Sequence, residues 1–178
     1  MKRVKNYKIK KFTYLVFFIS FFVFIPYCIV NYSNFLGDNN SQVEGNYFVT
    51  SVVDGDTIII KKDGKNKFVR LIGIDAPEVR SEYRKRDECF GSEAKKFLKE
   101  KVEGKYVRME SDVLVPERDR YGRLLRYIYF NETLINEVLI RKGYAYFVQY
   151  KEHQFSKNFL IIEQQAQEKD RGLWRVCN

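Results

Sequence analysis

The fold is decided by residues 47–74, YFVTSVVDGDTIIIKKDGKNKFVRLIGI, which carry three β-strand patterns in succession. The runs YFVTSVVD, DTIIIKK and KFVRLIGI are rich in β-branched and aromatic residues. An Asp54-Gly55 pair joins the first two runs and favours a tight hairpin turn. Pro77 follows the third run and ends it, because proline cannot pair within a sheet. Three strands with short turns predict a meander.

Two further strands and three helices follow this meander. The stretches YVRMES and LLRYIYF, residues 106–111 and 124–130, have strand composition. Apolar side chains recur at helical spacing in residues 92–103, 133–142 and 152–170, and a glycine closes each segment. The pattern predicts an α+β chain that is mainly β: a five-stranded OB-fold Greek-key barrel with three helices, preceded by an N-terminal membrane helix.

That membrane helix is predicted over residues 13–30, TYLVFFISFFVFIPYCIV, which contain no charge and follow a basic segment. This is the layout of a secretory signal or of an uncleaved signal anchor, and the run is just long enough to span a bilayer. The absence of a good small-x-small cleavage site favours the anchor, and cleavage stays open as the alternative. The predicted organisation is therefore a signal anchor or signal peptide at 1–30, a polar linker at 31–45 and one globular domain at 46–178.

The distribution of charge supports export of that domain. The formal net charge is +9, but six of the basic residues precede the apolar run. The rest of the chain carries 26 Lys and Arg against 23 Asp and Glu. We expect the positive end to stay in the cytoplasm, which gives a single-pass protein of the cell membrane with its domain outside, or a secreted protein if the signal is cleaved. Phosphate binding must be argued from individual residues.

Carboxylates and arginines are concentrated around the meander. Asp56 begins one predicted strand and Asp75 ends the next, so antiparallel pairing brings both to one end of the sheet. Two carboxylates, a main-chain carbonyl and waters suit Ca²⁺. Arg70 and Arg123 can grip the oxygens of a phosphate, and Glu78 is the candidate for activating water. Together these residues predict a site for cutting phosphodiesters.

This shared site requires a departure from regular strand geometry. Arg70 and Asp75 lie five positions apart, so strict alternation would point them to opposite faces. We therefore predict a bend or bulge between Gly73 and Asp75. Histidine chemistry is disfavoured, because His153 is the only histidine and is expected to be structural or merely exposed.

At this point the chain resembles the staphylococcal nuclease-like, or thermonuclease, family from about Tyr47 to Trp174. The matching stretches are VVDGDTI, FVRLIGIDAPE, FGSEAKKF, DRYGRLLRYIY, NEVLIRKGYA and GLW. The resemblance implies an OB-fold nuclease that uses Ca²⁺ to hydrolyse DNA and RNA and leaves 3′-phosphate ends. It implies metal ligation by Asp56, Asp75 and the main-chain carbonyl of Ala76, where the best-known members have threonine.

The resemblance also implies that Glu78 is the base and that Arg70 and Arg123 contact the phosphate in the transition state. Tyr121 matches a nucleotide-contacting tyrosine of the family. From the residues alone, Tyr144, Tyr146 and Tyr150 are candidates for base stacking, with packing on the barrel as the alternative.

Two cysteines lie beyond the apolar run, Cys89 before a predicted helix and Cys177 near the C-terminus. An oxidising compartment would let them pair, and two unrelated thiols are the alternative. We expect a monomer that acts on DNA, RNA or both, and a lipid membrane as partner through residues 13–30. Two other functions remain open: a non-catalytic OB module that binds nucleic acid or a protein, and an envelope-attached partner in DNA uptake.

Overall fold

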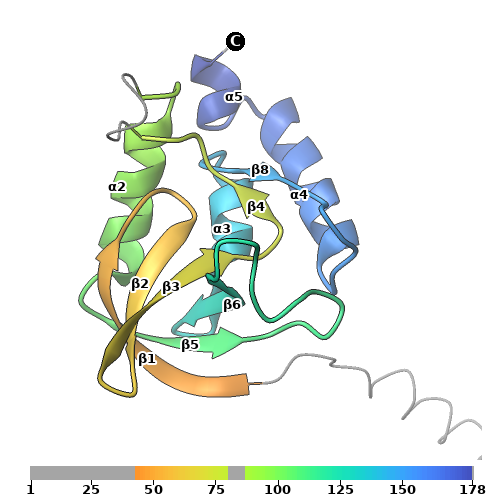
Figure 1. Ribbon diagram of the computed structural model, residues 1–178. Helices are drawn as coiled ribbons and strands as arrows, with labels where there is room; N and C mark the ends of the chain where they lie inside the picture. The colour runs from red at the N-terminus through yellow and green to blue at the C-terminus, as the bar shows by residue number, and fades with distance from the viewer. Residues whose placement is uncertain (1–42, 80–86, 178) are drawn as a thin grey trace, which may run out of the picture. The chain divides into compact units, whose positions relative to one another are not determined.

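A closed β-barrel is the framework of the domain that the structure describes (Figure 1). The computed structural model describes residues 43–79 and 87–177. The barrel strands follow the order β3-β2-β1-β5-β6, and parallel pairing of β3 with β6 closes the ring. Their bounds are β1 Val43–Val52, β2 Thr57–Lys62, β3 Lys65–Leu71, β5 Tyr106–Glu110 and β6 Leu124–Phe130. The predicted five-stranded barrel is confirmed, although β1 begins at Val43, inside the stretch expected to be linker.

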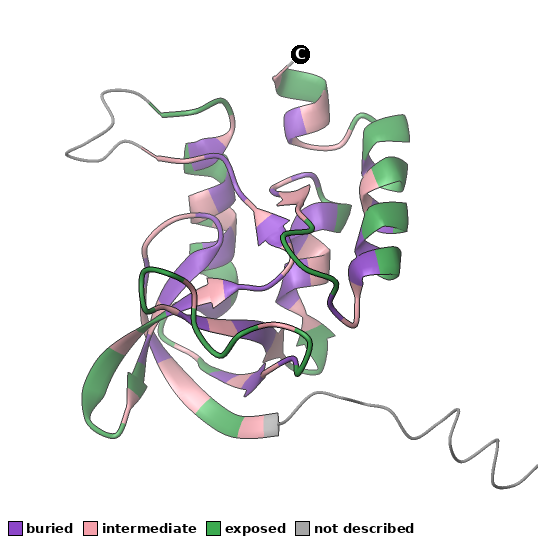
Figure 2. Cartoon of the chain, turned by 45° about the vertical axis from the view of Figure 1, so that its right-hand side comes forward, coloured by how far each residue is buried: buried purple, intermediate pink, exposed green. Residues whose placement is uncertain are grey.

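Alternation along the strands builds the core. Ile58 and Ile60 of β2 and Val69 and Leu71 of β3 are at most 1% exposed, whereas the residues between them face outward. Figure 2 shows this buried interior continuing onto the inner sides of the helices. Because the side-chain period of a strand is two, the same pattern decides which residues can reach an outer site.

Four helices are present in the described part of the chain, one more than predicted. They are α2 Gly91–Val102, α3 Ile135–Arg141, α4 Ser156–Glu168 and α5 Leu173–Val176. The fourth, α5, is a single turn at the C-terminal end that is too short to show helical periodicity. The last long helix begins at Ser156 rather than at residue 152, because the Ser156 hydroxyl accepts a hydrogen bond from the main-chain N–H of His153 in a turn before it.

Short strands complete the structure. β4, Ile74–Asp75, pairs with β8, Tyr146–Phe147, and β7, Thr133–Leu134, extends the edge at β6. A turn at Ile72 and Gly73 separates β3 from β4, and Gly73 has a φ of +75°. A Cβ on Gly73 would lie 2.5 Å from His153 Nε2, so glycine is required by both conformation and space. The predicted irregularity is therefore present, at the start of the expected interval.

His153 is buried, which makes the exposed alternative wrong. It is 4% exposed and packs against the rings of Phe147 and Phe159. Tyr127 donates its hydroxyl proton to Asp112 Oδ2 at 2.7 Å, so the 2.9 Å contact with His153 Nδ1 requires the imidazole to donate there. Nε2 then carries no proton, and it has no hydrogen-bond partner among the described residues. A chain of polar contacts thus fastens the segment before α4 to the barrel.

A disulfide joins Cys89, just before α2, to Cys177, just after α5. The Cα atoms are 5.7 Å apart, a normal separation for such a bridge. The segments predicted as membrane helix and most of the linker lie outside the described residues. In the parts that the structure does describe, no helix has the length and apolar character needed to cross a bilayer.

Candidate active site

One arginine holds two carboxylates at the end of the β2–β3 ribbon. Arg70 pairs with Thr57 across the ladder, so Asp56, the residue before β2, lies beside it. Arg70 Nη1 lies 2.5 Å from Asp56 Oδ2, and Nη2 donates to Asp75 Oδ1 at 2.6 Å. The Nη1 contact is an ion pair without hydrogen-bond alignment. The structure therefore brings together three predicted site residues from two separate segments.

Asp56 is the most enclosed of these groups, at 5% exposure. Its Oδ1 accepts a hydrogen bond from the Thr57 hydroxyl, and its Oδ2 accepts one from the main-chain N–H of Ala76, each at 2.9 Å. Burial raises the pKa of the Asp56 carboxyl above its ordinary value; the Arg70 guanidinium opposes this rise and Asp54 adds to it. The ionised form of Asp56 therefore depends on positive charge beside it.

Arg123 reaches the same end of the ribbon from the segment before β6. Its Nη1 donates to the Thr57 hydroxyl at 3.3 Å, and its Nε donates to Asp119 Oδ2 at 2.6 Å. Burial alone would raise the pKa of Asp119, but hydrogen bonds from the Arg123 side chain and from the main chain of Arg123 and Tyr121 lower it. Asp119 thus stays ionised and orients Arg123, while Thr57 lies between the two arginines.

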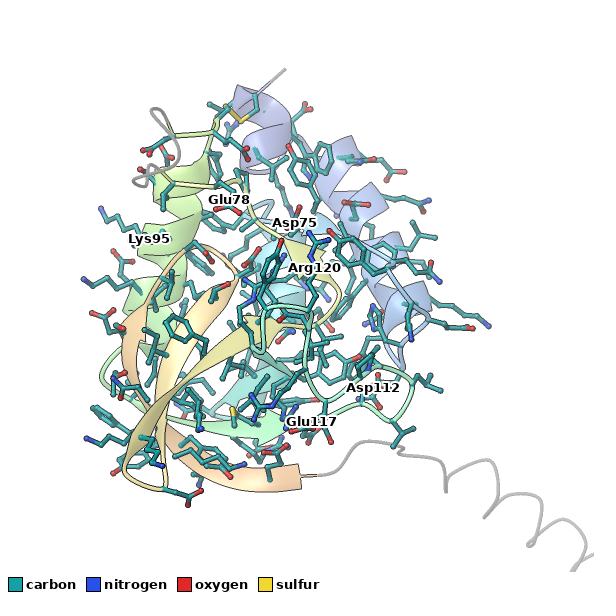
Figure 3. The ribbon with its side chains drawn as sticks, in the orientation of Figure 1. Asp75, Glu78, Lys95, Asp112, Glu117 and Arg120 are labelled. Carbon is teal, nitrogen blue, oxygen red and sulfur yellow. A yellow bond between two sulfur atoms is a disulfide. The ribbon has the colours of Figure 1, made fainter. Side chains whose placement is uncertain are left out.

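Glu78 lies on the segment that leads from β4 toward α2, three residues after Asp75, which ends β4 (Figure 3). Its main chain is held on both sides by Glu88. The N–H of Glu88 donates to the carbonyl of Glu78 at 2.8 Å, and the N–H of Glu78 donates to Glu88 Oε2 at 3.0 Å. Gly91 packs so closely that a Cβ there would lie 2.5 Å from the Glu78 carbonyl oxygen. Contacts beyond the Ala76-Pro77 turn therefore fix the position of Glu78.

A cleft of about 470 Å³ opens beside Arg70. Its polar lining is basic and aromatic, and comprises Arg118, Arg120, Tyr121, Arg123, Tyr150 and Lys151 together with Asp119 and His153. Tyr121 is 68% exposed and Tyr150 is 83% exposed, so both rings are accessible at this cleft. The guanidinium carbons of Arg120 and Arg123 lie 4.8 and 5.5 Å from the centre of the Tyr121 ring. An anion with an attached flat ring suits such a lining.

The other two tyrosines predicted to stack on bases do not line this cleft. Tyr144 packs on Phe97 with ring centres 4.2 Å apart, and on Phe90 at 5.4 Å. These contacts with α2 and the residue before it favour the packing alternative for Tyr144. Tyr146 pairs with Asp75 across β4 and β8, but its ring contacts the edge of Trp174. Tyr146 therefore lies near the carboxylates without facing the cleft.

The ligand atoms available at the two carboxylates are oxygens, which are the type that a hard divalent cation prefers. Asp56 and Asp75 supply oxygen ligands, and both lie within contact distance of one guanidinium. Across residues 43–79 and 87–177, no group of three or more His, Cys, Asp or Glu side chains could hold a metal ion. A cation here would consequently need main-chain oxygen and water to complete its shell. The buried Asp56 carboxyl favours a positive charge, which agrees with such a site.

Three residues of the site were not singled out from the sequence. Thr57 and Asp119 orient the arginines, and Glu88 holds the main chain of Glu78. Asp119 had a recognisable signal, because aspartate is a residue that favours turns. Its Oδ1 accepts the N–H of Tyr121, two positions on, as in an Asx turn. Glu88 had none, since ten positions separate it from its partner.

Comparisons with known proteins point to one family. The family model described as "Staphylococcal nuclease homologue" matches residues 68–176, more than half of the chain. The thermonuclease of Staphylococcus hyicus is 36% identical over 132 residues, which cover 74% of this chain and 76% of that protein. The thermonuclease of Staphylococcus intermedius is 36% identical over 140 residues, 76% of this chain and 80% of that protein. Endonuclease YncB of Bacillus subtilis is 31% identical over 134 residues, 72% of this chain and 61% of that protein.

Proposed function

This chain belongs to the family of staphylococcal nuclease homologues, and we propose that it is a nuclease, a hydrolase of phosphodiester bonds in nucleic acids. The observation that carries the proposal is the arrangement of Asp56, Arg70 and Asp75 at the end of the ribbon. A surface that only binds nucleic acid has no use for adjacent carboxylates, because they repel phosphate. Carboxylates beside phosphate-gripping arginines serve hydrolysis when a cation is held between them.

Arg70 and Arg123 bind the oxygens of the scissile phosphate. Both guanidiniums lie at the Thr57 end of β2, so they can reach one phosphate from two sides. Their contacts strengthen as charge builds on the phosphoryl oxygens in the transition state, which is the condition for rate acceleration. Asp119 keeps Arg123 in position throughout.

Asp56, Asp75 and the main-chain carbonyl of Ala76 are the residues that would hold Ca²⁺. When bound, Ca²⁺ supplies positive charge that polarises the phosphate and offsets its growing negative charge. The two carboxylates carry the negative charge that attracts the cation. Arg70 beside them neutralises that charge before substrate binds. Alanine in place of threonine at position 76 leaves the main-chain carbonyl available.

Glu78 takes a proton from the attacking water. The water oxygen bonds to phosphorus, the bond from phosphorus to the 5′-oxygen breaks, and that oxygen takes up a proton as it leaves. The products are a 3′-phosphate end and a 5′-hydroxyl end. Glu88 and Gly91 hold the main chain at Glu78, three residues after Asp75, so its carboxylate can act beside the metal-binding residues without being required as a ligand.

Tyr121 and Tyr150 contact the nucleoside next to the scissile phosphate, since both rings are exposed on the cleft that begins at Arg70. Tyr146 contributes to substrate binding indirectly, through its pairing with Asp75 across β4 and β8. The substrate is DNA, RNA or both, and the protein acts as a monomer. Residues 13–30 anchor it in the cell membrane with the domain outside the cytoplasm, or direct its secretion if they are removed.

The test uses the full-length chain purified in mild detergent, with labelled single-stranded DNA and RNA in buffer containing Ca²⁺ or EGTA. We expect cleavage with Ca²⁺ and none with EGTA, with 3′ ends that poly(A) polymerase extends only after phosphatase treatment. Without substrate, added Ca²⁺ should raise the melting temperature, because a ligand of the folded state stabilises it. Tight binding without cleavage would favour the non-catalytic module, and cleavage in EGTA would overturn the role of Ca²⁺.

The location is tested separately. Fractionation of cells that produce the chain should place it in the membrane fraction, and protease added to intact cells or protoplasts should digest the domain. Recovery from the medium of a protein that begins near residue 31 would replace the anchor with a cleaved signal.

A further inference from the structure

The outer face of the β2–β3 ribbon continues away from the active site. Strand alternation puts Thr57, Ile59 and Lys61 of β2 on this face, opposite Arg70, Phe68 and Asn66 of β3. We call these six residues the ribbon face. The active site lies at its Arg70 end, and its other end is the hairpin tip, which projects away from the helices α3 and α4 (Figure 1). The face therefore begins at the candidate active site and ends at the hairpin tip.

Phe68 is the unusual residue on this face. It is 48% exposed although its neighbours Val69 and Leu71 are buried, and its ladder partner is the half-buried Ile59. Phe68 and Arg70 are two positions apart on one strand, which separates their Cα atoms by about 7 Å. An exposed aromatic ring one step from a phosphate-binding arginine has no role in the core.

The far end of the ribbon face lies at a basic hairpin tip, where strand alternation puts Lys61 on the face itself. Within residues 61–67, KKDGKNK, four lysines accompany a single aspartate, but Lys65 and Lys67 alternate with Asn66 and lie on the opposite side of β3. Lys62 is paired with Glu44, whereas Lys61 and Lys65 are exposed. Next to Lys61 across the sheet lies Phe48 of β1, whose ring meets that of the exposed Tyr106 at 5.4 Å. Figure 2 shows the hairpin as largely exposed.

We propose that the ribbon face binds the single-stranded continuation of the nucleic-acid substrate, with a base stacked on Phe68 and a phosphate near Lys61. The inference rests on the proposed nuclease function and extends it from one scissile phosphate to several nucleotides on one side of the cut. Alternating aromatic and basic groups are what single strands require, since every base has a flat face and every link a negative charge.

The main test compares Phe68→Ala with Ile161→Ala, a matched change of an exposed apolar residue on α4. Full-length variants are assayed on a dinucleotide and on a single-stranded 12-mer. For Phe68→Ala we expect the KM of the 12-mer to rise by about tenfold, the effect typical of removing one stacked base, with kcat and the dinucleotide reaction unchanged. Ile161→Ala should match the wild type. An unchanged KM for the 12-mer in Phe68→Ala would overturn the proposal.

Salt dependence tests the basic end. Replacing Lys61 by glutamine should flatten the slope of log affinity against log salt by about 0.7, the change for one phosphate that the variant no longer neutralises. Affinity is measured by fluorescence anisotropy of the 12-mer in EGTA, so this readout does not need catalysis. If the wild type binds but never cleaves, the nuclease proposal fails while the ribbon face is still tested.

An anionic membrane surface is the competing occupant, because the tip is both basic and apolar. Vesicles of phosphatidylserine and phosphatidylcholine are sedimented with the wild type and with Phe68→Ala. Loss of vesicle binding in the variant, together with unchanged affinity for the 12-mer, would assign the face to lipid and reject the nucleic-acid proposal. Circular dichroism and melting curves establish that each variant is folded.

Discussion

Arg70 and Asp75 lie five positions apart in sequence, yet Nη2 of the arginine donates to Oδ1 of the aspartate at 2.6 Å. The turn at Ile72 and Gly73 makes this contact possible, because it ends β3 and starts β4 in a new direction. The same guanidinium lies 2.5 Å from Asp56. One side chain thus neutralises two buried or half-buried acids that would otherwise repel each other and the substrate.

Arg70→Lys should lower kcat by about 10² to 10³-fold, the loss seen when a donor to the transition-state oxyanion is removed. Lysine keeps the charge but lacks the planar fork that spans two carboxylates and a phosphate. Single-turnover cleavage of the 12-mer at saturating Ca²⁺ measures the effect. Arg171→Lys, on the loop between α4 and α5, is the matched control and should keep the wild-type rate. A rate for Arg70→Lys within about threefold of the wild type would remove Arg70 from the catalytic role.

Glu78→Gln should lower kcat by about 10² to 10⁴-fold, the range for removal of a general base, while KM for the 12-mer changes little. The amide keeps the size of the side chain but cannot accept the proton from water. Glu93→Gln, in the first turn of α2, changes another carboxylate in the same way and should have no effect. Equal losses in kcat for both variants would point to electrostatics of the region rather than to a base.

Asp119→Asn should misplace Arg123 and reduce kcat by up to about 10²-fold, since small displacements of catalytic groups are costly. The variant removes the ion pair to Arg123 Nε, although the asparagine can still accept the main-chain N–H groups of Tyr121 and Arg123. The pH dependence provides a second readout. Hydrogen bonds lower the pKa of Asp119 in the folded state, so it stabilises the fold above its ordinary pKa of 3.8, and that stability falls as pH drops through the lower, folded value.

Urea unfolding between pH 6 and pH 3 measures that difference. The wild type should lose stability more steeply than Asp119→Asn near the acid end of this range, because the variant has no carboxyl to protonate at this position. Identical curves would mean that Asp119 carries no net stabilisation, whatever its effect on kcat.

His153 should make the protein less stable below about pH 6.5. Burial lowers its pKa from the ordinary 6.5, and the negative charge of Asp112, reached through Tyr127, opposes the change. The unfolded chain therefore binds a proton first as pH falls, and stability drops by at most about 1.4 kcal/mol per pH unit from this group. Comparison of urea unfolding at pH 7.5 and 5.5 in the wild type and in His153→Gln isolates the effect. A wild-type loss no larger than that of His153→Gln would contradict it.

Local patterns in the sequence predict the barrel because alternation and turn residues are encoded within a few positions. The same holds for Asp56, Arg70 and Asp75, which the predicted pairing of neighbouring strands brings together. The burial of His153 and the packing of Tyr144 depend on elements distant in the chain, so no local pattern showed them. The contact of Glu78 with Glu88 joins residues ten positions apart, which no local pattern links. Tertiary packing, rather than local sequence propensity, determines these three features.

The bridge between Cys89 and Cys177 has a consequence for the timing of maturation. The two cysteines are 88 positions apart, and in the chain-entropy model a loop of that size restricts the unfolded ensemble by about 4 to 5 kcal/mol. A newly made polypeptide with both thiols reduced lacks this constraint. Cys89 follows directly on Glu88, which holds the main chain at Glu78. Oxidation therefore adds this constraint next to the candidate base. The hydrolase reaches its full stability only where its thiols can be oxidised.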